Sequence, residues 1–215
     1  MNKDLQRKIA ILSISLFVAS NSIISGTLVF MQKDFGISIT NAEFLVTLSS
    51  ISTIITMVLS EKVTQKIGIK KCVLLGFFLV GLSSIFPIVR TSYWSVVISR
   101  IIMGAGIGLF NGHSANYINI FFEGDKAFKL YGIRNSTEFI GQMLLLFIAG
   151  LFIKIHWHLA FLAYALAFIV LIYFYKVIPE VALDENEELG KFHFSKQIFF
   201  YVFFVAIMIM NMIAV

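Results

Sequence analysis

The sequence contains little of what builds a soluble or a cross-linked domain. A single cysteine, Cys72, occurs in 215 residues, which excludes an internal disulfide framework and a thiolate metal cluster. Two prolines and 14 glycines exclude a collagen-like or low-complexity chain. Charged residues make up only 13% of the chain, about half the share found in a typical soluble protein. This composition is therefore not that of a soluble protein.

Motifs for hydrolysis, ATP use and metal catalysis are also missing. The sequence has no Walker glycine loop, no H-E-x-x-H and no G-x-S-x-G. His156 and His158 flank Trp157, but an aromatic belt at a membrane interface explains them better than a metal site with two ligands. The net charge of +5 comes without a basic stripe interleaved with aromatics. We expect no enzyme, cofactor, metal or nucleic-acid partner.

Hydrophobic residues, in contrast, make up 59% of the chain. They gather in stretches of the length that spans a bilayer, which takes about 20 apolar residues in a helix. The first stretch is too long for a signal peptide and lacks a cleavage site. The sequence therefore predicts an all-α, multi-pass membrane protein. Its expected spans are 9–31, 41–60, 71–89, 94–121, 131–153, 158–178 and 197–215.

The distribution of Lys and Arg predicts the orientation. The loops after the first, third and fifth spans hold only Lys33, Arg90 and Lys154. Cytoplasmic loops of membrane proteins carry the excess of basic residues. We therefore place the N-terminus and the loops after the second, fourth and sixth spans in the cytoplasm. The expected location is the plasma or inner membrane of the cell. The basic residues on the cytoplasmic side are Lys3, Arg7, Lys8, Lys62, Lys66, Lys70, Lys71, Lys126, Lys129, Arg134, Lys176, Lys191 and Lys196.

The chain divides at an acidic stretch. Residues 1–180 carry the first six spans, 181–196 form a cytoplasmic central loop, and 197–215 are the seventh span. The loop is rich in carboxylates and has the composition of a linker between two helical groups. We expect the seventh span to begin a second, C-terminal bundle that these 215 residues do not contain.

Short motifs favour one known family. The loop after the second span reads E-K-V-T-Q-K-I-G-I-K-K from Glu61, and it resembles the pattern G-x-x-x-D-R-x-G-R-K through Lys66, Gly68 and Lys70. Glu61 and Gln65 replace the first Gly and the Asp.

The fourth span adds a more specific match. Arg100, Gly104, Gly106 and Gly108 fit R-x-x-x-G-x-G-x-G, a pattern whose arginine lies within the membrane. The sixth span is entered through W-x-x-A-F at Trp157.

With six spans before a long cytoplasmic loop, the chain resembles the N-terminal half of a major facilitator superfamily transporter. This resemblance implies two six-helix halves around a central site for a small molecule. The fifth span resembles the pattern of the superfamily's efflux antiporters through Gly132, Gly141 and Gly150, with Leu145 and Leu146 in place of its G-P pair.

Small residues recur every fourth position in the fourth span, at Gly104, Gly108 and Gly112. This spacing puts them on one helical face and lets a neighbouring backbone approach closely. We expect a close-packed seam, which serves either helix packing alone or also sliding during alternating access.

Polar residues inside the spans are the candidate pathway residues. Arg100 is a cation within the bilayer and is expected to face protein or a water-filled cavity, or to extend to the surface. Asn111 lies nearly in phase with Arg100 and predicts a shared polar stripe. Asn21, with Ser22 and Ser25, lies midway along the first span, which borders the cavity in the family.

Glu138 is the candidate proton carrier because it is the carboxylate that lies well inside a span. It shares a helical stripe with Arg134, Gly141 and Gln142, so Arg134 one turn away is expected to pair with it. His113 lies at a similar depth and is either a hydrogen-bonded core residue or a second proton relay.

Together these features predict a secondary transporter that works by alternating access, as a proton-coupled efflux antiporter for a drug-like or metabolite substrate. Two alternatives stay open: a proton symporter for sugar or organic acid uptake, and a non-transporting membrane interaction or sensor protein.

Overall fold

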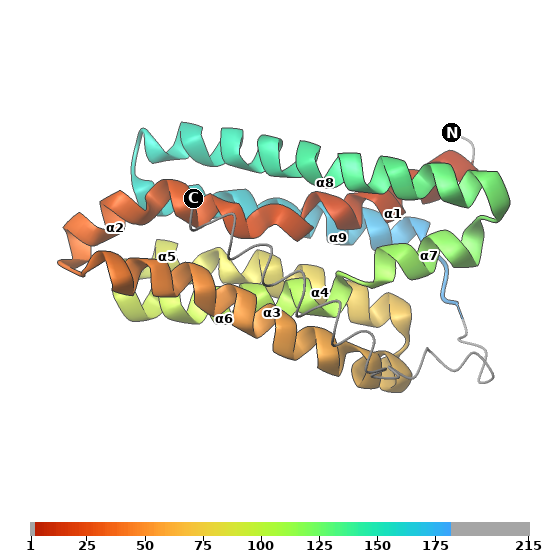
Figure 1. Cartoon of the computed structure of the whole chain (residues 1–215), viewed down its shortest axis with the longest axis horizontal. Helices are drawn as coiled ribbons and strands as arrows, with labels where there is room; N and C mark the ends of the chain where they lie inside the picture. The colour runs from red at the N-terminus through yellow and green to blue at the C-terminus, as the bar shows by residue number, and fades with distance from the viewer. Residues whose placement is uncertain (1–2, 182–215) are drawn as a thin grey trace, which may run out of the picture. The chain divides into compact units, whose positions relative to one another are not determined.

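Helices account for all the regular structure that the computed structural model describes, which covers residues 3–181 (Figure 1). Apart from Val181, the expected acidic loop and the seventh span lie outside the described residues. Within the described part, six helical segments are long and apolar enough to cross a membrane, which confirms the predicted all-α membrane bundle. They are Lys3–Phe35, Ile39–Ile67, Ile69–Val89, Tyr93–Phe121, Gly124–Ile153 and Trp157–Val177.

Several spans consist of more than one element. The first contains α1 (Lys3–Leu16), the 3₁₀ helix η1 (Val18–Thr27) and α2 (Leu28–Phe35), and the second is α3 (Ile39–Ile67). The third contains α4 (Ile69–Ser83) and α5 (Ile85–Val89), and the fourth α6 (Tyr93–Phe110) and α7 (His113–Phe121). The fifth is α8 (Gly124–Ile153), and the sixth contains the 3₁₀ helix η2 (Trp157–Ala165) and α9 (Leu166–Val177).

Helices α3 and α8 are longer than the apolar stretches that predicted them. Hydropathy detects the part of a helix that lies in hydrocarbon, whereas lysines are good helix formers and continue the helix into water. Lys62 and Lys66 thus lie in the last turns of α3, and Lys126 and Lys129 lie in the first turns of α8.

Gly68 ends α3 and starts α4. Its φ of 85° lies in the region that side chains disfavour, and its N–H donates to the carbonyl of Thr64 over 2.8 Å. The glycine of the motif is thus required by the backbone turn, while Lys66 in the last turn of α3 is exposed.

Glycines let α6 pack tightly on two sides. A Cβ at Gly108 would lie 2.6 Å from the carbonyl oxygen of Thr53 in α3, and Gly104 meets the carbonyl of Ser49 in the same way. On the opposite side, Gly106 would meet the carbonyl of Gly76 in α4 at 2.6 Å. The predicted seam is present at the first two of its glycines.

Gly112 does not belong to this seam, contrary to the prediction. It is exposed, and a Cβ there would have nothing within 4 Å. Gly112 follows the end of α6 at Phe110, in the turn before α7, and no neighbouring backbone approaches it there.

A cluster of aromatic side chains lies in the core between the spans. The ring of Phe77 in α4 stacks on Phe110 of α6 with 4.9 Å between centroids. It also lies 6.0 Å from the ring of Phe17 and 6.1 Å from that of Phe174 in α9. One side chain therefore connects four of the six spans.

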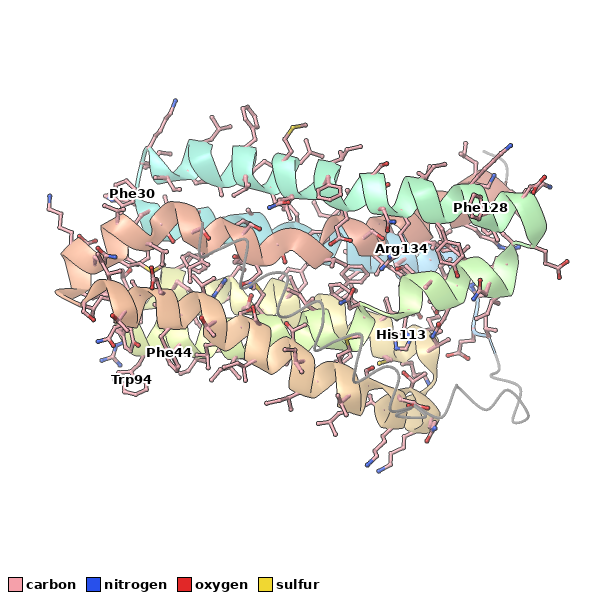
Figure 2. All side chains as sticks on the ribbon, in the orientation of Figure 1. Phe30, Phe44, Trp94, His113, Phe128 and Arg134 are labelled. Atoms are coloured by element: carbon pink, nitrogen blue, oxygen red, sulfur yellow. The ribbon has the colours of Figure 1, made fainter. Side chains whose placement is uncertain are left out.

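Large apolar side chains cover the outside of the bundle. Trp94 is 72% exposed and Phe128 is 80% exposed. In Figure 2, Trp94 lies with Phe44 and Phe30 toward one end of the bundle, and Phe128 lies toward the other. Such surfaces are suited to lipid rather than water, in agreement with a multi-pass membrane protein.

Candidate functional site

The midpoint of the bundle carries a set of polar side chains from three spans, which we call the polar cluster: Asn21, Ser22, Ser50, Glu138 and Gln142. Gln142 in α8 donates from Nε2 to Oγ of Ser22 in η1 over 2.8 Å. Asn21 donates from Nδ2 to Oγ of Ser50 in α3 over 3.2 Å. These bonds join the first span to the second and to the fifth.

The polar cluster retains unused hydrogen-bonding capacity. Among the described residues, nothing donates to the Oδ1 atom of Asn21. Ser25 follows Ser22 by three residues and is exposed, and in a 3₁₀ helix this spacing puts both hydroxyls on one face. The Oδ1 atom of Asn21 is itself buried, whereas the exposed Ser25 hydroxyl can both donate to and accept from a polar molecule.

Gly141 sets the distance between the fifth span and the first. A Cβ at Gly141 would collide with the carbonyl oxygen and Cα of Leu16 at the end of α1. This close approach brings the neighbouring Gln142 within reach of Ser22. The glycine of the efflux-like pattern thus has a packing role in this bundle.

Glu138 precedes Gln142 by one turn and is half-buried. Within residues 3–181 its carboxylate makes no hydrogen bond or ion pair. The expected pair with Arg134 is not formed, because that guanidinium is bound elsewhere. Glu138 therefore keeps its carboxylate available at the level of the polar cluster.

Arg134 joins α8 to the start of α7. Its Nε donates to Oγ of Ser114 over 2.6 Å, and Nη2 donates to the carbonyl oxygen of Asn111 over 3.5 Å. Nη1 donates to Oδ1 of Asn135 over 3.3 Å. In Figure 2, Arg134 extends from α8 toward the start of α7. The turn in the fourth span thus exposes a backbone carbonyl that a straight helix would have used internally.

His113 makes a second connection at the same turn. Its Nε2 lies 3.0 Å from Oγ1 of Thr64 in α3, and its Nδ1 lies 3.4 Å from Nδ2 of Asn116. The imidazole is buried, with 6% of its surface exposed. This geometry is that of a hydrogen-bonded core residue, one of the two roles expected for His113.

Arg100 is fully buried and faces protein. Its Nη1 donates to the hydroxyl oxygen of Tyr164 over 3.0 Å, and its Cζ lies 5.0 Å from the ring centroids of both Tyr164 and Phe161. Nε and Nη2 have no partner among the described residues. The predicted stripe with Asn111 is not formed, because Arg100 packs against the sixth span while Asn111 lies in the turn beyond α6.

Sequence reasoning missed Ser50, Thr64, Ser114 and Tyr164. Hydroxyls in a spanning helix commonly bond to their own backbone, as Thr27 does to the carbonyl of Ile24 over 2.8 Å. A sequence does not distinguish such residues from those that bond across helices. Their only signal is their occurrence in apolar stretches.

The paired histidines lie at an aromatic end of the bundle. The rings of His156 and His158 stack with 5.3 Å between centroids, and Nε1 of Trp157 donates to Oδ2 of Asp34 over 2.5 Å. In residues 3–181, no three of His, Cys, Asp and Glu come together in a way that could hold a metal ion.

Comparison with known proteins adds the family. A family model described as Major Facilitator Superfamily matches residues 10–215. No protein of curated function matches the sequence significantly.

Solved structures share the fold. The inward-open xylose transporter XylE from E. coli is 22% identical, with a TM-score of 0.71 over 83% of this chain and 49% of that one. The proton:xylose symporter XylE bound to 6-bromo-6-deoxy-D-glucose is 23% identical, with a TM-score of 0.70 over 82% of this chain and 45% of that one. The chain thus spans about half the length of these transporters.

Proposed function

This chain belongs to the Major Facilitator Superfamily, and we propose that its bundle forms the N-terminal half of a secondary transporter that moves a small molecule by alternating access. The superfamily consists of transporters, which agrees with the expectation that the chain is not an enzyme. The observation that carries the proposal is the polar cluster at the midpoint of the bundle. Substrate sites of such transporters lie near the bilayer midplane.

A second six-helix bundle completes the site in this proposal. The solved structures that share the fold are about twice as long as the part that this chain matches. Ser25 and Ser50 are exposed at the level of the polar cluster, and Glu138 is half-buried there. Polar groups at that depth are costly in lipid and are normally turned to protein or to a water-filled cavity. A facing bundle provides both.

The chemistry of the cluster favours a neutral, hydroxyl-bearing substrate such as a sugar. Asn21, Ser22 and Gln142 offer amide and hydroxyl groups that match alcohol groups in both directions. An organic acid would need a free cation, but Arg100 is buried against the sixth span and Arg134 is bound to Ser114. The solved structures that share the fold include a sugar symporter.

Efflux, the direction expected from the sequence, remains the second candidate. Its support is the glycine pattern of the fifth span, yet Gly141 is explained by its contact with Leu16, and Gly132 and Gly150 have open space around them. The glycine pattern of the fifth span therefore has a packing role at Gly141 alone, and it gives no evidence for the direction of transport. For this reason we place proton-coupled uptake ahead of export.

Protons are the proposed coupling ion, with Glu138 as their carrier. An unpaired carboxylate within a span costs a few kcal/mol unless it is hydrated or protonated. A change of access between the two sides changes its hydration, and so its affinity for a proton, which is the requirement for coupling. In the conformation described, Arg134 is held by Ser114 and does not neutralise Glu138.

Transport by the full-length protein in proteoliposomes tests the proposal. Vesicles with an imposed proton gradient are expected to accumulate one of a panel of labelled pentoses and hexoses, and a protonophore is expected to abolish accumulation. Export of a hydrophobic dye without sugar uptake would favour the second candidate. No gradient-dependent flux of any compound would leave a non-transporting role and contradict the proposal.

A further inference from the structure

A basic groove lies at one end of the bundle, where α1, α4 and α9 meet. It encloses about 630 Å³. The charge distribution of the loops assigns this end to the cytoplasmic side of the membrane. The groove is remote from the polar cluster and is independent of the transported substrate. Its walls are formed by Lys3, Gln6, Arg7, Lys70, Tyr173, Tyr175, Lys176, Val177, Ile178 and Pro179.

The charge of the groove is of one sign. Lys3, Arg7, Lys70 and Lys176 line it, and none of the carboxylates in the described part of the chain does. Glu180, close by in sequence, is directed to Lys71 instead, with Oε1 3.9 Å from Nζ. The groove is thus a concave site with a positive potential, which favours an anion.

Aromatic rings hold two of these cations in place. The ammonium of Lys70 lies 4.9 Å from the ring centroid of Tyr175, and the guanidinium of Arg7 lies 4.9 Å from that of Phe121. The hydroxyl of Tyr173 donates to the carbonyl of Gln6 over 3.4 Å and ties α9 to α1. The cations are therefore arranged before a ligand arrives, which lowers the entropy cost of binding.

We propose that this groove binds the phosphate headgroup of an anionic phospholipid. Basic pockets between spanning helices on the cytoplasmic side are suited to such headgroups. A soluble phosphate would use only the cations, whereas Val177, Ile178 and Pro179 add an apolar wall at the end of a spanning helix. Tyrosines at the same level are typical of the membrane interface. The groove therefore fits a ligand that is charged at one end and apolar at the other.

Native mass spectrometry of the purified full chain tests this site. The protein is titrated with phosphatidylglycerol and with phosphatidylcholine, and the apparent Kd of each lipid is measured. The test variant is Lys3→Gln/Lys70→Gln/Lys176→Gln. The matched control is Lys62→Gln/Lys66→Gln/Lys126→Gln, which removes the same charge from exposed positions outside the groove. An arginine version of the test variant keeps the charge.

We expect the test variant to weaken phosphatidylglycerol binding by at least about tenfold, since it removes three of the four cations that attract the phosphate. The control is expected to stay within about twofold, the arginine version to restore binding, and phosphatidylcholine to bind weakly throughout. Equal losses in the test variant and the control would indicate diffuse attraction and overturn the proposal, as would unchanged binding in the test variant.

Two further measurements address other occupants of the groove. Displacement of phosphatidylglycerol by excess inorganic phosphate would identify a soluble anion as the ligand. Asp184, Glu185, Glu187 and Glu188 follow the groove in sequence. If phosphatidylglycerol binds only after these four are changed to Asn or Gln, the groove belongs to this acidic segment. Either result overturns the lipid proposal, and binding that is insensitive to both changes supports it.

Discussion

Gln142 and Ser22 are 120 positions apart in sequence, yet Nε2 of the amide lies 2.8 Å from Oγ of the hydroxyl. This hydrogen bond crosses between the fifth span and the 3₁₀ segment of the first. It uses the amide nitrogen of Gln142, and in the proposed function the carbonyl oxygen is left for a ligand. Ser22 is thus the partner that positions the side chain of Gln142 in the proposed site.

Replacing Gln142 by Ala is expected to raise the KM for the transported substrate about fivefold or more, because a hydrogen bond to a neutral group is worth about 1 kcal/mol. Uptake kinetics in proteoliposomes measure the effect. Gln65→Ala, at an exposed position near the end of α3, is the control and should leave KM unchanged. Ser22→Ala should give a smaller rise, since it frees the amide without removing it. An unchanged KM in Gln142→Ala would remove Gln142 from the binding site.

Glu138→Gln is expected to abolish accumulation driven by the proton gradient while leaving exchange of substrate at equal concentrations. The amide keeps the shape and polarity of the side chain but cannot carry a proton. Counterflow and gradient-driven uptake measured on the same vesicles separate the two processes. Glu43→Gln, at an exposed carboxylate near the start of α3, should behave as the unmodified protein. If Glu138→Gln keeps full proton-driven uptake, coupling must reside in another residue.

Gly108→Ala and Gly112→Ala form a matched pair in the fourth span. A methyl group at Gly108 would lie 2.6 Å from a backbone oxygen of Thr53, so α3 and α6 must separate, at a cost of about 1–3 kcal/mol. At Gly112 the space is open and φ is −75°, which alanine adopts without strain. Thermal unfolding followed by size exclusion should show a lower midpoint for Gly108→Ala alone. Equal midpoints in the pair would argue against the seam.

Cysteines introduced at Lys66 and Lys126 test the orientation. In a Cys72→Ser background, a membrane-impermeant maleimide should label both positions only after the cytoplasmic side is opened. Both side chains are exposed, so access depends on membrane sidedness rather than on burial. A cysteine at Lys33, in the loop on the other side, should react in intact cells. The reverse pattern would invert the topology drawn from the basic residues.

Hydropathy predicted the six described spans because a bilayer imposes a minimum length of apolar helix. It did not predict the turn at Asn111 and Gly112, since both residues occur inside apolar helices as well. The predicted stripe of Arg100 and Asn111 was wrong because Arg100 bonds to Tyr164 of the sixth span. The third glycine of the seam was wrong because no neighbouring backbone approaches Gly112. A spacing of four residues places small residues on one helical face, but it contains no information on how far a neighbouring helix follows that face.

For the candidate site, the sequence identified residues but not partners. Glu138, Arg134 and Gln142 were recognised because polar groups are rare inside spans. A fixed spacing of four residues predicted a pair of Glu138 and Arg134, whereas Arg134 bonds to Ser114 across helices. Local spacing reports neighbours on one helix, and it contains no information on which side chain of another helix competes for the same guanidinium.

The 3₁₀ winding of η1 has a mechanical consequence for the first span. A 3₁₀ helix rises about 2.0 Å per residue, against about 1.5 Å in an α-helix. Over the 10 residues from Val18 to Thr27 the difference amounts to about 5 Å, close to the pitch of one α-helical turn. The first span is therefore about 5 Å longer than the same residues would be in an α-helix, and the extra length lies at the level of Asn21 and Ser22. A change of Val18–Thr27 from 3₁₀ helix to α-helix would shorten the span and rotate its two ends relative to each other, without a bend in the backbone.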